Sequence, residues 1–398
     1  KGQGGLRYIH TIVWVMMRHF GTSSLEELSK REILTDFEYD VLLRCRELLW
    51  QLRYAMHMVT GREEDLLLFD YQKDVAEILG FEDNDEMLGV EQMMLQYYRC
   101  TMALGEMNNL LMLLFNEIII DSKQAQDIQP ISEYFQRHND YLEIQHEDLF
   151  KHHPNAMLEV FYYLASDSSL KGVRANTVRA LRDSYKLIDD DFCSNPHNIR
   201  TFMAILRCDD HVVRELDRML RYGILGRYIP EFGKIIGHMQ HDLFHSYTVD
   251  QHSLRAIRFI RHLRFGQEKE TFPVASKLIH NTSKKEILYL AALLHDVGKA
   301  LPGEHECTGA EIAEQFCIQH GLSQQDTDLI VWLVRNHLFF SQASQRLDIA
   351  DPEAIQQFAS HIGDRRRLHY LYILSVADIY STNRTLWNGW RAEQMRTL

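Results

Sequence analysis

The chain has 398 residues, of which 45% are hydrophobic and 25% charged, proportions typical of a globular protein with two or three domains. Its 20 glycines and 7 prolines are few for this length, which favours helices. The net charge of −13 argues against a nucleic-acid binder, because such proteins carry a basic surface. The longest apolar run, near residues 110–120, is too short and too interrupted to cross a membrane.

The cysteines and the first residues indicate a cytoplasmic protein. Six cysteines show no CxxC spacing, so we expect reduced thiols, and nothing resembles a signal peptide. Residues 1–10 begin with a glycine-rich turn and a strand-like segment, Leu6–Ile9, which we interpret as the trailing edge of a preceding domain. From Thr11 onward apolar residues recur at three- and four-residue steps, which predicts a central helical domain over residues 11–225.

One short interval departs from the helical period. Tyr134–Arg137 and Tyr141–Ile144 flank His138-Asn139-Asp140, a pattern that predicts a small β-hairpin near residues 134–144. Helices are expected again from Pro154. A connector punctuated by glycine and proline, residues 222–237, then leads into a last domain over residues 226–398. The predicted fold class is mainly all-α.

The last domain contains an adjacent His295-Asp296 pair at the end of an apolar helix, Leu290–Leu294. A buried carboxylate beside a buried imidazole is costly unless a positive charge neutralises it. A divalent metal ion supplies that charge, and histidine with aspartate suits Zn, Mn, Fe or Mg.

Further candidate ligands lie on other predicted helices. His252 follows a capping-box pattern, Thr248–Gln251, that predicts a helix from Val249 with His252 facing inward. His305 is expected in a loop before a second such pattern at Thr308 and Glu311. His337 ends an apolar helix, and Asp378 lies inside another without an obvious cationic partner. Each histidine alone is more often a core or surface residue, but the ordered set indicates a metal site.

The set His252, His295-Asp296 and Asp378 resembles the HD superfamily of metal-dependent phosphohydrolases, which are all-helical. Longer stretches are similar to the bacterial bifunctional uridylyltransferase/uridylyl-removing enzymes. These are residues 240–252, 291–299, 343–349 and 375–379 in the last domain and, upstream, residues 53–55, 61–65 and 68–70.

The resemblance implies an activity, a partner and a ligand set. The activity is metal-dependent removal of UMP from a tyrosine of the nitrogen-regulatory protein PII. One Mg or Mn ion would be held by His252, His295, Asp296 and Asp378. Asp296 could bridge to a second ion held by His305 and His337.

Three nearby residues leave alternatives open. Lys299 is either a contact to the substrate phosphate or a cation that answers the dipole of its helix. Cys307 could bind a soft metal, although an oxygen-rich phosphate site disfavours this. His245 is expected to pack rather than to bind metal.

The sequence also departs from the family pattern. The family's transferase site needs paired aspartates after a Gly-Ser turn, and Gly21-Thr22-Ser23 is followed by none; Tyr8 stands where we expect an acidic residue. No glutamine-sensing ACT domain is recognised. We therefore expect a glutamine-insensitive hydrolase without uridylyltransferase activity. Two alternatives remain: an HD nucleotidase or cyclic-dinucleotide phosphodiesterase, and a non-catalytic PII-binding scaffold.

Overall fold

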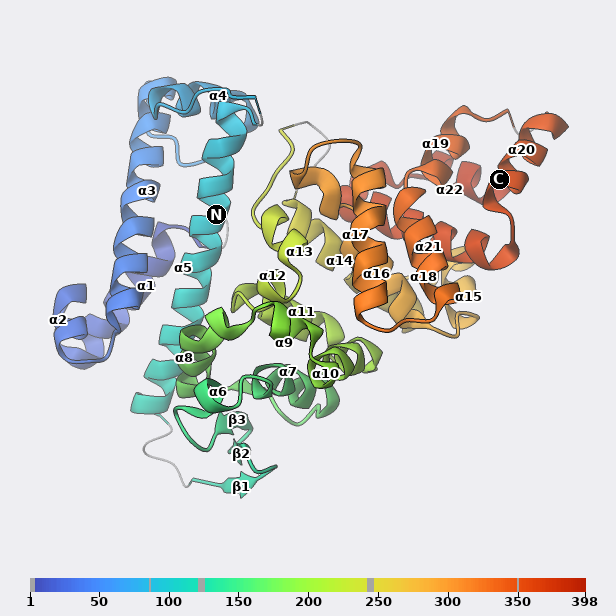
Figure 1. Ribbon diagram of the computed structural model, residues 1–398. Coiled ribbons are helices and arrows are strands. Elements are labelled where there is room, and N and C mark those ends of the chain that lie inside the picture. Colours follow the sequence, from blue (N-terminus) through green and yellow to red (C-terminus); the bar gives the residue numbers. More distant parts are fainter. Residues whose placement is uncertain (1–3, 86, 121–125, 242–246, 349–350) are drawn as a thin grey trace.

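The computed structural model describes residues 4–85, 87–120, 126–241, 247–348 and 351–398. Within these ranges the protein is mainly helical, with one small sheet, and the predicted fold class is confirmed (Figure 1). No helix in the described part of the chain combines the length and apolar character needed to span a membrane. His245 lies outside the described residues, so its predicted packing role stays a prediction.

The N-terminal helices form an elongated unit in which two long helices run side by side (Figure 1). Its elements are α1 (Leu6–Phe20), α2 (Leu25–Lys30), α3 (Asp36–Thr60), α4 (Phe69–Ile78) and α5 (Gly89–Ile119). A capping box between Thr35 and Glu38 starts α3, and Gly61 ends it with a positive φ of 64°, which glycine adopts without steric cost.

The strand-like segment predicted at Leu6–Ile9 is wrong, because these residues form the first turns of α1. Ile9, Ile12 and Met16 recur at helical spacing and are buried against α5, so tertiary packing selects helix over strand here.

The predicted hairpin is confirmed and belongs to a four-stranded sheet. Its strands are β1 (Ile128–Pro130), β2 (Phe135–His138), β3 (Tyr141–Ile144) and β4 (Gly172–Val173), in the order β1-β2-β3-β4. The first three strands pair antiparallel, and β4 joins β3 in parallel. Asn139, in the two-residue turn between β2 and β3, has a φ of 55°, a conformation that asparagine tolerates better than most residues.

A second group of helices follows the hairpin in the chain, and α8 of this group contacts β3. It consists of α6 (Leu149–His152), α7 (Ala156–Ser166), α8 (Ala175–Ser184), η2 (Tyr185–Leu187), α9 (Asp190–Ser194), α10 (Pro196–Arg207), α11 (Val212–Arg221), α12 (Leu225–Tyr228) and α13 (Pro230–Ile235). Their buried side chains join those of the C-terminal helices in one hydrophobic cluster that extends from Leu110 to Met395. The boundaries at residues 10 and 225 stay predictions.

The C-terminal helices surround one central helix. They are α14 (Val249–Arg264), α15 (Pro273–His280), α16 (Lys285–Leu294), η3 (Val297–Ala300), α17 (His305–Gln319), α18 (Gln324–Arg335), α19 (Phe339–Arg346), α20 (Pro352–Ile362), α21 (Arg365–Thr382), η4 (Arg384–Leu386) and α22 (Gly389–Thr397). Every residue of α16 from Ile287 to Leu294 is buried, because α14, α18 and α21 pack around it.

Side-chain contacts join the N-terminal helices α1–α5 to the helices that follow them in the chain. Glu38 on α3 is 1% exposed and accepts two hydrogen bonds from Arg179 on α8, at 2.9 and 2.8 Å. Near the entry to α14, Arg99 donates to the carbonyl of Ile236, and the rings of Phe69 and His241 stack at 4.1 Å.

Candidate metal centre

All six of the predicted ligand residues come together around the end of α16. His295 is the C-cap of that helix and Asp296 is the N-cap of η3, while His252 lies in the first turn of α14. Three further residues complete the set: His305 at the start of α17, His337 just after α18, and Asp378 inside α21. Since their sequence positions span residues 252–378, the whole C-terminal fold is needed to assemble them.

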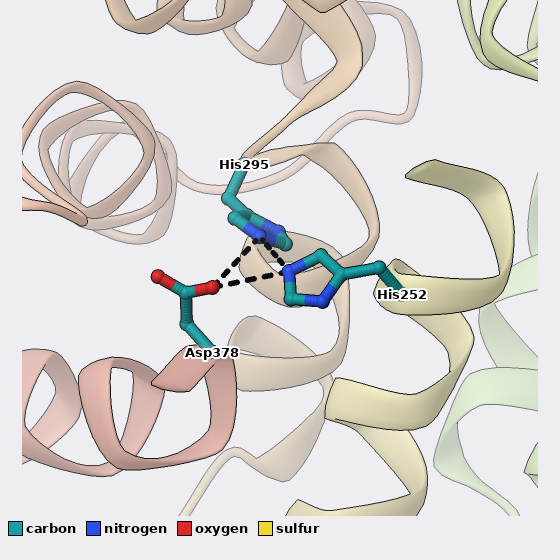
Figure 2. A group of neighbouring side chains, drawn as sticks. All are labelled: His252, His295 and Asp378. Carbon is teal, nitrogen blue, oxygen red and sulfur yellow. Dashed lines mark hydrogen bonds and ion pairs between the residues drawn. The ribbon is translucent and has the colours of Figure 1, made fainter. Parts of the chain in front are cut away.

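One group consists of His252, His295 and Asp378, whose side chains point toward one another (Figure 2). The Nε2 atoms of the two histidines lie 3.0 Å apart, and Asp378 Oδ1 is 3.0 Å from His252 Nε2 and 3.8 Å from His295 Nε2. A single divalent ion could be held between atoms at these separations.

A second group consists of Asp296, His305 and His337. Asp296 Oδ1 lies 3.8 Å from His305 Nε2 and 3.7 Å from His337 Nε2. His337 is 1% exposed in its side chain, whereas His305 is 28% exposed and forms the open side of the group.

Asp296 lies between the two groups. Its other oxygen, Oδ2, is 3.7 Å from His252 Nε2 and 3.5 Å from His295 Nε2, and it accepts an ion pair from Lys299 Nζ at 2.7 Å. Lys299 lies in η3, after α16 has ended, and its ion-pair partner is the carboxylate of Asp296.

Backbone contacts fix two of the imidazole rings. His295 Nδ1 lies 2.9 Å from the carbonyl of Ala292, and His337 Nδ1 lies 2.7 Å from that of Val334. In each case Nδ1 must be the donor, so the Nε2 lone pair is directed into the site. This arrangement is usual for metal-binding histidines and supports the fit of a metal ion.

The electrostatics of the site favour a neutral His295 and two charged carboxylates. Complete burial lowers the pKa of His295 to about 4, against the opposing effect of Asp296 and Asp378. Burial alone would raise the pKa of Asp296, but His295 and Lys299 hold it well below its usual range. The pKa of Asp378 is likewise low: burial raises it, but the hydrogen bond to His252 and the electrostatic attraction of His252, His295 and His337 together outweigh burial. Neutral histidines and ionised aspartates are the forms that bind metal.

A close backbone contact holds His305 next to Asp296. Gly298 in η3 packs against the start of α17, where an added Cβ would lie 2.3 Å from the carbonyl oxygen of His305. The residue type is the signal for this contact, because a glycine allows two backbones to approach closely.

Both predicted capping boxes are wrong. Thr248 is the N-cap of α14, as expected, but makes no side-chain cap; its hydroxyl bonds to the buried carboxylate of Asp250 instead. Helix α17 starts at His305 rather than near Thr308, whose hydroxyl donates to the carbonyl of Pro302 from within the first turn. His305 is therefore a helical residue, not a loop residue.

Other neighbours were less visible in the sequence. Arg391 on α22 is close enough to Asp378 to feel its charge, and it donates to Ser341 Oγ at 2.7 Å. Cys307 is exposed and belongs to neither group; its thiol contacts Glu304.

Three family models match successive parts of the chain. The description "GlnD PII-uridylyltransferase" matches residues 1–112, "Uridylyltransferase GlnD third domain" matches residues 135–228, and "HD domain" matches residues 249–383. The HD match contains all six residues of the two groups.

Curated relatives extend this similarity over nearly the whole chain. Proteins described as bifunctional uridylyltransferase/uridylyl-removing enzyme from Pseudomonas fluorescens, Pseudomonas aeruginosa and Azotobacter vinelandii are each 48% identical over 99% of this chain. The chain spans 44% of the length of each of these relatives. On these matches, the chain belongs to the family of bifunctional uridylyltransferase/uridylyl-removing enzymes and carries its HD domain.

Proposed function

We propose that this chain is a metal-dependent phosphodiester hydrolase that removes UMP from a uridylylated tyrosine of PII. The observation that carries the proposal is the convergence of four imidazoles and two carboxylates in one matched HD domain, with two Nε2 lone pairs directed inward. The uridylyl group and PII come from the names of the relatives and of the matched family model.

We assign one ion to His252, His295 and Asp378, and a second to Asp296, His305 and His337, with Mg or Mn as the expected metal. Such ions supply Lewis acidity that activates water and neutralises charge at phosphorus. The histidines provide nitrogen donors, and Asp296 faces both groups with separate oxygens. The leaving group is a phenolate, whose conjugate acid has a pKa of about 10 and so needs less protonation than an alkoxide.

Lys299 is proposed as a contact to the substrate phosphate. Its ammonium group is held 2.7 Å from Asp296 Oδ2, and its side chain is 10% exposed, so it can exchange part of this ion pair for a phosphoryl oxygen. Lys299 is thus a cation placed beside Asp296, the residue that lies between the two candidate metal-binding groups.

The test is UMP release from uridylylated PII by the purified chain, with Mg or Mn and with a chelator. Metal-dependent release is expected. Free nucleotides and cyclic dinucleotides are assayed in parallel, and preferred hydrolysis of either would contradict the proposed substrate. Tight PII binding with no turnover in any divalent metal would instead favour a non-catalytic scaffold.

A further inference from the structure

A cavity of about 560 Å³ opens beside the second group of candidate ligands. Its walls come from the start of α17, from the segment joining α18 to α19, and from the end of α20. His305 belongs both to this wall and to the group with Asp296 and His337, so the cavity adjoins the candidate metal centre. A volume of this size is within the range that small-molecule ligands occupy.

We infer that this cavity is the subsite for the nucleoside of a uridylyl group. The inference rests on the proposed hydrolysis of a uridylyl ester at the metal centre. In UMP the ribose is joined to phosphorus through one oxygen and one methylene carbon, so the nucleoside must lie directly beside the site that holds the phosphate.

One wall offers a fixed aromatic surface. His361 is exposed, but its ring contacts that of Phe339 at 4.1 Å, and its Nε2 lies 2.7 Å from Asn336 Oδ1. An imidazole held in this way loses little freedom when a flat base stacks on its open side. Stacking on aromatic side chains is how many proteins hold unpaired bases.

The other walls of the cavity carry the acidic Glu304 and Glu306, the basic Arg335 and the side-chain amide of Gln342. Gln342 can donate and accept hydrogen bonds, which matches the alternating carbonyl and N–H groups of uracil. Glu304 and Glu306 offer acceptors to the ribose hydroxyls. Because these two carboxylates outnumber the single cation of the lining, Arg335, the net negative charge opposes a second phosphate at this position. The set thus favours a nucleoside over a polyphosphate.

Cys307 provides a direct probe of occupancy. It lines the cavity and is the exposed one among the six cysteines, of which four are buried and Cys208 is half-buried. Alkylation of Cys307 should slow several-fold with uridine, even without metal, and with UMP in Mn, but not with inorganic phosphate. Equal protection by UMP and phosphate, or no protection by either nucleoside ligand, would overturn the inference.

Kinetics separate the subsite from the metal chemistry. The intact chain is assayed with uridine 5′-(p-nitrophenyl phosphate) and with bis(p-nitrophenyl) phosphate, which has no nucleoside. His361→Ala and Gln342→Ala should each lower kcat/KM for the uridine ester by about tenfold more than for the other ester. Gln325→Ala, at the opposite end of α18, is the matched control.

Failure of the proposed function and failure of the proposed nucleoside subsite would give different results. If neither ester is hydrolysed in Mg or Mn, the proposed function fails, whereas Cys307 protection by uridine still reports on the cavity. If both esters are hydrolysed and the cavity variants change them by the same factor, the subsite is wrong. A loss confined to uridylylated PII would show that the cavity holds the protein partner instead, which also overturns the inference.

Discussion

Asp296 Oδ1 lies 3.7 Å from His337 Nε2, while Oδ2 of the same carboxylate is turned toward His252 and His295. One side chain therefore belongs to both clusters of imidazoles. Its neighbours on the two sides come from α14, the end of α16 and the segment after α18, so a change at Asp296 affects both groups.

Replacing Asp296 with asparagine should lower the rate of UMP release at least about 100-fold, because the shared negative charge is lost while the side-chain shape is kept. Helical content, measured by circular dichroism, should stay close to that of the unchanged protein. Asp328→Asn, at an exposed position on α18, is the control. Retention of full activity by the Asp296 variant would refute the assignment of this residue.

Metal content tests whether there are two ions. The unchanged protein should bind about two ions per chain, and His337→Ala should bind about one, with the group around His252 still occupied. Atomic emission analysis after equilibration with Mn measures both. A single ion per chain in both proteins would mean that His305 and His337 serve the substrate or packing.

The chain is expected to transfer no UMP from UTP to PII. Nucleotidyl transfer requires paired carboxylates that hold metal ions around the triphosphate. The turn at Gly21-Thr22-Ser23 leads into α2 and supplies no such pair. Incubation with labelled UTP, PII and Mg, followed by detection of labelled PII, measures this directly, and reproducible labelling would contradict the expectation.

Removal of Glu38 should destabilise the protein strongly. Glu38→Ala removes the buried carboxylate that accepts two charge-assisted hydrogen bonds from Arg179, whose side chain is 23% exposed, and a hydrogen bond to a charged group contributes about 1.5–3 kcal/mol. The midpoint of urea unfolding should fall accordingly. Glu47→Ala, an exposed position on the same helix, is the control, and a similar midpoint in the two variants would disprove the role given to this pair.

Stability should fall as the pH drops from 7 to 5, in part because of His320. Burial lowers the pKa of His320 to about 4, and its Nε2 accepts a hydrogen bond from Tyr228. In this pH range the unfolded chain takes up a proton that the folded chain does not, so the free energy of unfolding decreases by about 2 kcal/mol.

His320→Gln should remove this part of the pH dependence, whereas replacement of the exposed His146 should not. Urea unfolding at several pH values gives the slopes. Identical slopes for the unchanged protein and the His320 variant would show that His320 does not contribute.

The residue types that form the site could be predicted from the sequence, whereas their arrangement in space depends on helix packing. Residue types and helical spacing gave His252 its inward direction, and α14 begins at Val249 as expected. The division into two groups depends on how α16, α17, α18 and α21 pack, which no local pattern contains. The fit of Gly298 against His305 is likewise a contact between two segments, at the start of α17.

Tertiary contacts also override the local sequence patterns at Leu6–Ile9 and at Thr248. The first segment is helical because Ile9 and Ile12 find a hydrophobic partner in α5, which lies far along the chain. The Thr248 hydroxyl has a buried carboxylate within reach, and satisfying that carboxylate takes precedence over a helix cap.

The scattered origin of the six side chains has a consequence for folding. His252 and His295 are 43 residues apart and are brought within 3.0 Å of each other, so an ion bound between them would act as a cross-link that closes a long loop. The binding energy of such an ion becomes available only when the surrounding helices are in place. Metal uptake would then report complete folding of the C-terminal helices, and the metal-loaded protein would resist unfolding more than the metal-free form does.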